Sequence, residues 1–488
     1  MYVPINLTDE TLFRQQCYID GKWVSADDGT DFLVTNPADG TKLGRVPNMG
    51  AREVSRAVLA AYAAWPEWRA RTAKERAEIL KRWFGLVMAN QKDLAVILTS
   101  EMGKTLAESR GEVAYAGAFL EWFAEEGRRI DGDVIPTHRE DNRIIVIKQP
   151  VGVCAAITPW NFPIAMPARK AAPALAAGCT MVLKPAGQTP YSALALVELA
   201  DRAGLPKGVL NIVTGNSSII GRELTGNPLV RKVSFTGSTA VGKLLMRQCS
   251  GTLKKLSLEL GGHAPFIVFE DADLDAAVEG ALIAKYRASG QTCICANRIL
   301  IQESVYDAFV AKFVSAAEGL AVGNGLDPTV NIGPLIDKAA VEKVEKHIRD
   351  GVDKGATLSL GGKRHKLGQT YFEPTILTEV TPDMLCAREE TFGPVAPIMR
   401  FGSEEQAISI ANDTDYGLAA YIYSRDLARV IRVTEALEYG MVGVNTGLIS
   451  TETAPFGGVK QSGIGREGSK YGIQEYLETK YVCLGNLR

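Results

Sequence analysis

From residue 151 onward, short apolar runs alternate with helical stretches. VGVCAAI (151–157), CTMVLK (179–184), GVLNIV (208–213), KVSF (232–235) and LSLEL (256–260) have the composition of buried strands. Segments such as LALVELADRAG lie between them and have helical spacing. Because parallel strands are joined by crossovers that helices usually supply, this alternation is typical of a doubly wound parallel sheet. We therefore expect an α/β fold.

The rest of the chain predicts further units around this sheet. Residues 52–128 are expected to be mostly helical, with Thr72 and Glu75 spaced as a capping box. A second α/β unit is predicted from about 263 to 459, with helices near 303–319, 338–354 and 426–437. Residues 141–149 and 476–485 both alternate apolar and polar side chains, so they are expected to pair as strands. A chain of 488 residues exceeds one ordinary hydrophobic core, so two or three domains are expected.

Charge and hydropathy argue against several classes of partner. The formal net charge is −2 and no long basic run occurs, so neither a nucleic acid nor an anionic membrane is an expected partner. The first residues lack the apolar core of a secretory signal. The longest nearly apolar run, 171–183, is shorter than the roughly 20 residues that span a bilayer. Eight cysteines scattered through apolar runs suit free thiols in a reducing compartment, which favours the cytoplasm. A matrix-type organelle stays open if a transit peptide was removed.

Two cysteines, Cys293 and Cys295, stand one residue apart in SGQTCICANR (289–298). A zinc site needs four ligands, usually from two close pairs, and there is no second close pair of cysteine or histidine. The only histidines are at positions 138, 263, 347 and 365. We therefore predict no metal site, and the scattered histidines also make a Cys–His hydrolase a weak reading. This stretch alone leaves two interpretations open. Cys293 and Cys295 could be two buried structural thiols, or one of them could be a nucleophile and the other its neighbour.

Several motifs place polar side chains at predicted strand ends, where α/β folds bind ligands. Trp160 and Asn161 follow a strand in ITPWNFP, and Glu259 ends a strand in LELGG. FTGSTAVG (235–242) has a strand, a glycine turn and a helix start, which suits a phosphate. Lys184 ends a strand in LKPAGQTP, and EETFGP (389–394) and PFGGVKQSG (455–463) add glycine-containing loops.

Together these motifs resemble the aldehyde dehydrogenase superfamily over essentially the whole chain. The segments LEWFAEEGRRIDGDVIP, RASGQTCICANR and GREGSKYGIQEYLETKYVCLG resemble its succinate-semialdehyde dehydrogenase branch. The resemblance implies a Rossmann-like cofactor domain from 1–129 and 150–262 and an α/β catalytic domain from 263–470. It also implies a small β oligomerisation arm from 130–149 and 471–488, and therefore a homodimer or homotetramer.

The resemblance implies a covalent mechanism. Cys293 matches the family nucleophile, which forms a thiohemiacetal with the aldehyde and then a thioester. The Asn161 side chain and the Cys293 backbone N–H match the oxyanion hole, in which one donor is typically worth roughly 10²–10³ in rate. Glu259 matches the general base that activates water, a role that a pKa raised by burial would favour. The alternative readings are a strand-end carboxylate in an ion pair for Glu259 and a turn-forming residue for Asn161.

The resemblance also implies a dinucleotide cofactor. NAD-preferring relatives often carry a glutamate three residues after the lysine that matches Lys184, and this chain has Gly187 there. Without that carboxylate a 2′-phosphate meets no like charge, so we predict use of NADP, with NAD accepted too. The expected cofactor-binding residues are Trp160, Asn161, Lys184, Pro185, Ala186, Gly187, Gly237, Ser238, Leu260, Glu390 and Phe392.

For the substrate, the resemblance implies that Arg169 and Arg287 point into the funnel and bind a distal carboxylate. A charged hydrogen bond contributes roughly 1.5–3 kcal/mol. Ser450 would add a hydroxyl, and Phe162 and Phe456 would form apolar walls. We therefore predict oxidation of succinate semialdehyde to succinate. Glutarate semialdehyde and a broader aldehyde range stay open, because one methylene is often discriminated only about 10–200-fold. A structural ion pair is the alternative role for either arginine.

Cys295 is expected beside the nucleophile, either as partner in an inhibitory disulfide or as a buried small residue, and His263 receives no role. Three rival activities remain. A CoA-acylating relative would lack the glutamate base, a thiol esterase would not need the dinucleotide motifs, and a non-catalytic binding protein would be expected to lose Cys293, Glu259 or Asn161. All three residues are present, so the sequence favours an enzyme.

Overall fold

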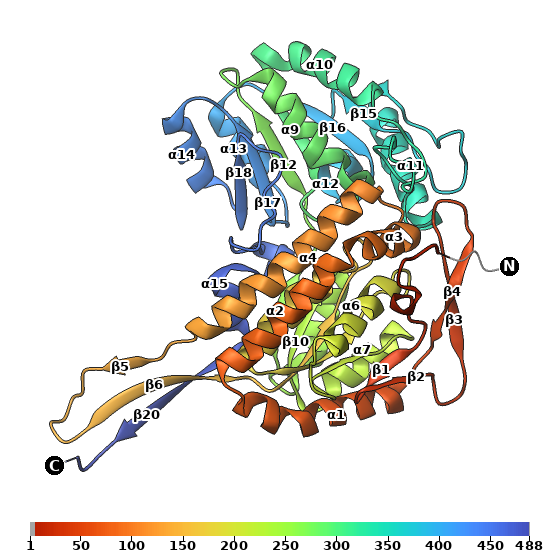
Figure 1. The fold of residues 1–488 in the computed structure, drawn as a ribbon. Coiled ribbons are helices and arrows are strands. Elements are labelled where there is room, and N and C mark those ends of the chain that lie inside the picture. Colours follow the sequence, from red (N-terminus) through yellow and green to blue (C-terminus); the bar gives the residue numbers. More distant parts are fainter. Residues whose placement is uncertain (1–4, 488) are drawn as a thin grey trace.

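The computed structural model describes residues 5–487, arranged as two lobes and a projecting arm (Figure 1). The lower lobe in Figure 1 contains an eight-stranded sheet. Its strands are β1 (Cys17–Ile19), β2 (Lys22–Val24), β7 (Val153–Ile157), β8 (Thr180–Lys184), β9 (Leu210–Ile212), β10 (Val230–Thr236), β11 (Lys255–Glu259) and β19 (Gly463–Ile464). The order is β19-β11-β10-β7-β8-β9-β1-β2. Strands β7 to β11 pair in parallel, which confirms the doubly wound sheet.

The edges of this sheet come from distant parts of the chain. Strand β1 pairs antiparallel with β2 and β9, and β19 pairs antiparallel with β11. Residues 463–464, which the sequence assigns to the catalytic domain, therefore extend the first sheet. The predicted domain limits at residues 1 and 488 lie outside the described residues.

The upper lobe contains a seven-stranded sheet. Its strands are β12 (Ala264–Val268), β13 (Ala296–Gln302), β14 (Thr357–Leu360), β15 (Thr375–Thr378), β16 (Val395–Phe401), β17 (Ala419–Tyr423) and β18 (Met441–Val444). The order is β14-β15-β16-β13-β12-β17-β18, and all neighbours are parallel except β14 and β15. This is the predicted second α/β unit.

Helices cover both sheets. The predicted helical region contains α1 (Ala51–Ala70), α2 (Ala73–Ala89), α3 (Gln91–Met102) and α4 (Leu106–Glu126), and Thr72 and Glu75 form the expected capping box. The helices that connect consecutive strands of the first sheet are α5 (Ala165–Ala177), α6 (Tyr191–Arg202), α7 (Ser217–Gly226) and α8 (Thr239–Ser250). The later helices are α9 (Leu274–Tyr286), α10 (Tyr306–Glu318), α11 (Lys338–Asp353), α12 (Leu385–Arg388), α13 (Glu404–Asn412), α14 (Leu427–Ala436) and α15 (Ser469–Gly472). Within residues 5–487, none of these helices has the length and hydropathy needed to cross a bilayer.

The arm is a three-stranded sheet that projects from the lower lobe (Figure 1). It consists of β5 (Asp133–Ile135), β6 (Arg143–Pro150) and β20 (Leu477–Leu484). Strand β20 pairs antiparallel with β6 along eight residues, which confirms the predicted pairing of the two alternating segments. A separate hairpin is formed by β3 (Asp31–Thr35) and β4 (Lys42–Pro47).

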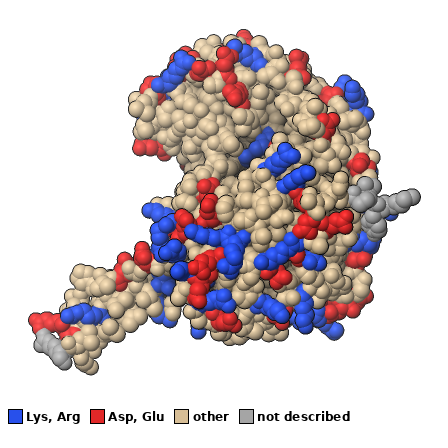
Figure 2. Space-filling model, viewed as in Figure 1, with Lys and Arg blue, Asp and Glu red and all other residues tan. Residues whose placement is uncertain are grey.

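The central strands are apolar because both of their faces are covered. Every residue of β7 and β8 is buried, as expected for parallel strands between two layers of helices. On the surface, basic and acidic side chains are interspersed over the face shown in Figure 2. This mixture gives that face no extended field of one sign.

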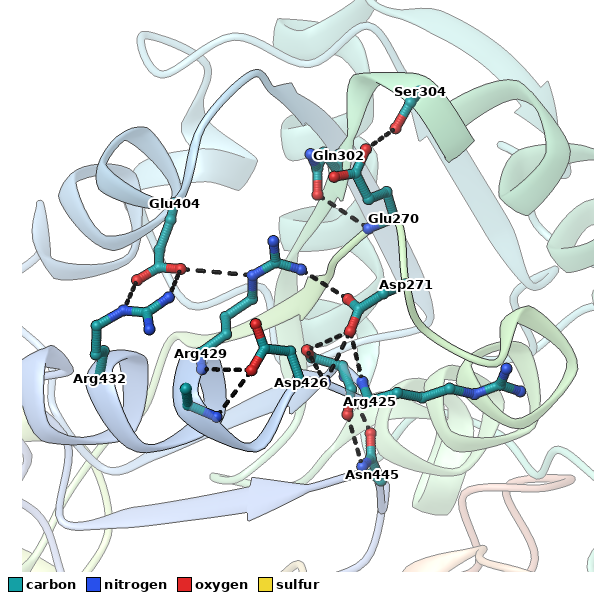
Figure 3. A network of polar contacts seen from close by, with 12 residues as sticks. Glu270, Asp271, Gln302, Ser304, Glu404, Arg425, Asp426, Arg429, Arg432 and Asn445 are labelled. Carbon is teal, nitrogen blue, oxygen red and sulfur yellow. Dashed lines mark hydrogen bonds and ion pairs between the residues drawn. The ribbon is translucent and has the colours of Figure 1, made fainter.

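A polar network closes the outer edge of the upper sheet, beyond the carboxyl ends of its strands (Figure 3). Asp271 Oδ2 accepts hydrogen bonds from Ser424 Oγ at 2.9 Å and from the backbone N–H groups of Arg425 and Asp426 at 2.8 Å. Its Oδ1 accepts from Arg429 Nη1 at 2.7 Å. Burial alone would raise the pKa of Asp271, but these hydrogen bonds together lower it. The polar groups at the carboxyl ends of these strands therefore bond to one another within the protein.

Replacing Asp271 by alanine is expected to destabilise the upper lobe by about 1–3 kcal/mol, because four donors lose a charged acceptor. Since the native pKa of Asp271 is lowered, its contribution is present near neutral pH and is lost as the pH falls through that pKa. Urea unfolding at pH 7 and at a pH below 3.8, the usual pKa of an aspartate, measures both effects. An unchanged midpoint at pH 7 would rule out a stabilising role, and kcat should be unaffected.

Candidate active site

The predicted site residues converge where the two lobes meet. Asn161 follows β7, Ser238 follows β10 and Glu259 ends β11, all at the carboxyl edge of the first sheet. Cys293 precedes β13 at the amino edge of the second sheet. A cavity of about 620 Å³ lies between these edges. Its position matches the general rule that open α/β sheets bind ligands at the carboxyl ends of their strands.

Most of the predicted site residues line this cavity. They are Trp160, Asn161, Phe162, Arg169, Gly237, Ser238, Leu260, Arg287, Cys293, Glu390, Phe392, Ser450 and Phe456. The predicted residues that do not line it are Lys184, Pro185, Ala186, Gly187, Glu259 and Cys295.

Cys293 lies in the loop between a short 3₁₀ turn, Arg287–Gly290, and β13. Burial raises the pKa of its thiol to about 12, although the nearby Arg169 guanidinium acts in the opposite direction. The glycine turn of LELGG packs against this loop. A Cβ atom on Gly262 would lie 2.1 Å from the carbonyl oxygen of Cys293, so only glycine permits this approach. Cys293, the predicted nucleophile, is therefore a thiol in the resting protein and lies close to the end of β11.

Cys295 is buried and its thiol donates a hydrogen bond to the Lys285 carbonyl in α9 at 3.3 Å. Both cysteines of the pair are free. A regulatory disulfide between them stays a prediction. Among residues 5–487, no cluster of three or more histidine, cysteine or acidic side chains has the arrangement of a metal site.

Asn161 is buried beside the loop that contains Cys293. Its side-chain amide donates to the carbonyl of Gln291 at 3.0 Å, two residues before Cys293. Its own backbone carbonyl accepts a hydrogen bond from Lys104 at 2.7 Å. The amide predicted to stabilise an oxyanion is thus next to the predicted nucleophile.

Glu259 is 2 % exposed, and neither of its carboxylate oxygens has a hydrogen-bond partner within the described part of the chain. Burial, followed by the neighbouring Glu467 carboxylate, raises the pKa of Glu259 well above its usual value. Arg169 and Lys170 oppose this shift without cancelling it. A buried carboxyl group with a raised pKa and no hydrogen-bond partner has the character of a general base.

Arg169 has a carboxylate partner inside the protein that the sequence did not reveal. Its Nε lies 2.5 Å from Glu467 Oε2, and Lys170 Nζ lies 2.5 Å from Glu467 Oε1. Burial raises the pKa of Glu467, but Lys170 and Arg169 outweigh it and lower the pKa below the usual value. The guanidinium also lies 4.2 Å from the centre of the Phe456 ring. The structural ion pair left open for Arg169 is therefore present.

Glu467 and Lys170 are two residues beside Arg169 that the sequence did not indicate. Glu467 lies in GREGSKYG, a segment that carried the family resemblance, but nothing in the sequence indicates its burial. Lys170 directly follows Arg169, and its Nζ also donates to Ser234 at 2.9 Å. The adjacent basic residues Arg169 and Lys170 were the only signal in the sequence.

Arg287 differs from Arg169 in having no carboxylate within ion-pair distance among residues 5–487. It is half-buried, lines the cavity, and lies 5.6 Å from the centre of the Phe162 ring. Ser450 lines the same cavity. The side chain is thus a cation available to an anionic ligand.

Other residues fit a dinucleotide. Glu390 Oε1 accepts from the Gly262 N–H at 2.9 Å, and burial raises the pKa of Glu390 to about 7. Ser238 caps the amino end of the twelve-residue helix α8, whose free N–H groups suit a phosphate. At Gly237 a Cβ atom would lie 2.4 Å from the Phe235 ring, so the turn requires glycine. The rings of Trp160 and Phe392 pack edge to face, with their centres 5.5 Å apart.

Lys184 lies outside the cavity, yet it fits a ribose or phosphate partner. It is buried, its Nζ donates to the Pro185 carbonyl at 3.0 Å, and burial lowers its pKa to about 8. A side chain at Gly187 would begin 3.5 Å from the Phe32 ring, so the neighbourhood presents an aromatic surface there.

His263 has a structural role that the sequence did not indicate. Its Nε2 lies 2.9 Å from the Ala387 carbonyl and therefore carries the proton, while its own carbonyl accepts from Arg298. Burial lowers the pKa of His263 well below its usual value, so the ring is neutral. It ties the end of the LELGG turn to the segment before EETFGP.

Known proteins share both the sequence and the fold. The aldehyde dehydrogenase family model matches residues 23–482. A glutarate-semialdehyde dehydrogenase of Pseudomonas aeruginosa is 64% identical over 99% of this chain and 100% of its own length. An NADP(+)-dependent succinate-semialdehyde dehydrogenase of Escherichia coli is 62% identical over 99% of this chain and 100% of its own length.

A solved structure described as an E. coli NADP dependent enzyme superimposes with a TM-score of 0.98 and 62% identity. It covers 98% of this chain, and the match includes 100% of that structure. The same fold and a family match along most of the sequence leave one conclusion. The chain belongs to the aldehyde dehydrogenase family.

Proposed function

We propose that this enzyme oxidises a short aldehyde with a distal carboxylate, succinate semialdehyde, to the dicarboxylic acid, with NADP as the preferred cofactor. The observation that carries the proposal is Arg287, a cation in the cavity of Cys293 without a carboxylate partner in residues 5–487. A partly desolvated guanidinium binds a carboxylate strongly, because a charge-assisted hydrogen bond is shorter and stronger than a neutral one. Ser450 supplies a hydroxyl in the same cavity.

The chemistry begins with Cys293. Its thiol first releases its proton to solvent, a step that the nearby Arg169 guanidinium favours by stabilising the thiolate. The thiolate attacks the aldehyde carbon, and the carbonyl electron pair moves to the oxygen, where the Asn161 amide and the Cys293 N–H donate hydrogen bonds. NADP, when bound, supplies the acceptor for the hydride that leaves this carbon. A thioester on Cys293 remains. Glu259 then removes a proton from water as its oxygen attacks the thioester carbon, and collapse of this adduct releases the acid and the Cys293 thiolate.

The choice of cofactor follows from the charges near Lys184. No acidic side chain stands at position 187, so a 2′-phosphate meets no like charge there, and a cationic Lys184 would attract it. The Escherichia coli relative named as NADP(+)-dependent supports this choice. NAD, which lacks the phosphate, is proposed as a second, weaker cofactor.

Glutarate semialdehyde is the second candidate substrate, because one relative bears that name and the anion at Arg287 would be the same. The side chain of Arg287 is long, and within the described part of the chain its guanidinium has no ion-pair partner. Discrimination of one methylene is therefore expected to be modest, on the order of 10-fold.

Replacing Arg287 by alanine is expected to lower kcat/KM for succinate semialdehyde by roughly 10–100-fold, the value of one charged hydrogen bond. Butyraldehyde, which lacks the carboxylate, should lose less than about threefold. Initial rates measured by nicotinamide absorbance, with NADP and NAD in parallel, give both ratios. Arg425→Ala, which removes an exposed arginine that does not line the cavity, is the matched control.

An equal loss of kcat/KM for both substrates in Arg287→Ala would contradict the proposal that Arg287 binds the substrate carboxylate. Arg169→Ala is expected to behave in that unselective way, because it leaves Glu467 buried beside only one of its two cations.

The arm supports a proposed homodimer or homotetramer. It exposes apolar side chains that a partner subunit would cover, including Val134 at 78% and Tyr481 at 59% exposure. The eight cysteines are all free thiols, which supports the proposed location in the reducing cytoplasm.

A further inference from the structure

Three charged side chains at the start of α4 reach the active-site cavity. Lys104 precedes the helix, and Glu108 and Glu112 follow at intervals of four residues, so the two carboxylates lie on one face of α4. In Figure 1, α4 runs between the lower and the upper lobe. No step of the proposed mechanism uses these residues.

Lys104 is 2 % exposed and holds the segment that carries Asn161. Its Nζ donates to Glu112 Oε2 at 2.6 Å and to the Asn161 backbone carbonyl at 2.7 Å. The same ammonium lies 3.8 Å from the centre of the Phe162 ring, whose neighbour in the cavity is Arg287. One cation thus fixes the backbone of the predicted oxyanion donor and an aromatic wall of the substrate funnel.

Glu112 fixes the other end of this segment. Its Oε1 accepts from the backbone N–H groups of Ile164 at 3.0 Å and Ala165 at 3.2 Å, at the start of α5. The Lys104–Glu112 pair therefore holds the backbone of residues 161–165 at two points. Lys104 bonds to the Asn161 carbonyl, and Glu112 bonds to the N–H groups of Ile164 and Ala165. Displacement of the 161–165 backbone away from α4 would require these contacts to break.

Glu108 holds the opposite wall. Its Oε1 accepts from the Ala288 N–H at 2.6 Å. Ala288 and Ser289 have φ values of 50° and 59°, a left-handed conformation that costs energy in residues with a Cβ. The carboxylate stabilises this strained segment, which connects Arg287 to Cys293.

We propose that Lys104, Glu108 and Glu112 are positioning residues, which set from α4 the distance between the Asn161 amide and the segment of Arg287 and Cys293. This inference rests on the oxyanion role proposed for Asn161. Stability alone explains the buried pair poorly, because the desolvation of two charges largely cancels their attraction and an apolar pair is often as stable. A donor displaced by about 1 Å, in contrast, costs on the order of 10²-fold in rate.

The test removes the ion pair without leaving a charge behind. Lys104→Met alone would strand the buried Glu112 carboxylate and is expected to fold poorly. In the double variant Lys104→Met/Glu112→Gln, the glutamine oxygen still accepts from the α5 N–H groups, while the donor to the Asn161 carbonyl is gone. Lys81→Met is the matched control, since it breaks a Lys–Glu pair between α2 and α4 whose members are half exposed.

The double variant is expected to lower kcat for aldehyde oxidation by roughly 10–100-fold, with an unchanged KM for NADP. Hydrolysis of p-nitrophenyl acetate without cofactor, which needs Cys293 and an oxyanion donor, should fall by a similar factor. The melting temperature should stay close to that of the wild type, and Lys81→Met should match the wild type in every assay. Wild-type rates in the double variant would overturn the proposal.

A cycle with Asn161→Ala separates positioning from a general loss of structure. If the pair acts through Asn161, adding Lys104→Met/Glu112→Gln to Asn161→Ala should reduce kcat by less than about threefold further. A further loss as large as in the wild-type background would overturn the proposal while leaving the role of Asn161 intact. If Asn161→Ala alone retains full activity, the oxyanion role itself fails.

Discussion

Cys293→Ser is expected to lower kcat for aldehyde oxidation by roughly 10⁴–10⁶-fold, the size of effect seen when a covalent nucleophile is removed. A serine hydroxyl ionises far less readily than a thiol, and the surroundings already raise the pKa of Cys293 to about 12. No nearby thiol replaces it, since Cys295 does not line the cavity and donates to the Lys285 carbonyl. Steady-state formation of reduced nicotinamide measures the loss.

Cys295→Ala is the matched control, because it removes the other thiol of the same loop. It should retain kcat within about threefold, since a buried cysteine acts as a small apolar side chain. Both variants should keep the melting temperature of the wild type. If Cys295→Ala were inactive and Cys293→Ser active, the nucleophile would be misassigned.

Glu259→Gln is expected to lower steady-state kcat by roughly 10²–10⁴-fold, the range for a lost general base. Hydride departure precedes the attack of water, so the variant should still release one equivalent of reduced nicotinamide per site in a rapid burst. Rapid-mixing absorbance separates the burst from the slow turnover that follows. Glu478→Gln, which alters an exposed carboxylate on β20, is the matched control and should show wild-type turnover.

The pH dependence gives a second signature of Glu259. Its pKa is raised, so the carboxyl group keeps its proton to a higher pH than an exposed glutamate does. Only the ionised form accepts a proton from water. Turnover limited by thioester hydrolysis should therefore rise with pH through this pKa in the wild type and lose that rise in Glu259→Gln. A variant without a burst would instead assign Glu259 to activation of Cys293.

The strands of the first sheet and the positions of the motifs were predictable because both depend on local features. Runs such as VGVCAAI and CTMVLK are apolar throughout, and they form the buried strands β7 and β8. Asn161 and Glu259 follow or end such strands, and parallel strands bring their carboxyl ends to one edge. Their approach to Cys293 came from the family resemblance, since that residue belongs to the other sheet.

The contacts that set the charges of the site were not predictable in the same way. Arg169 was expected either to bind a substrate carboxylate or to form a structural ion pair. It forms an ion pair with Glu467, which lies 298 positions later in the chain. Strand β19 likewise joins the first sheet from within the segment assigned to the second. Neither contact leaves a local periodic signal, because each joins residues that are close only after both lobes have folded.

The sequence by itself determined the alternation of strands and helices, the chemical types at the strand ends and the missing carboxylate at Gly187. Only the tertiary structure decided that, among residues 5–487, Glu259 is buried without a hydrogen-bond partner and Arg287 rather than Arg169 has no carboxylate partner. It also decided that side chains of α4 and its N-terminal flank contact both walls of the cavity. Periodicity follows from backbone geometry over a few residues. Burial and ion pairing instead depend on which distant side chains exclude water from a group, and that is fixed when the lobes pack together.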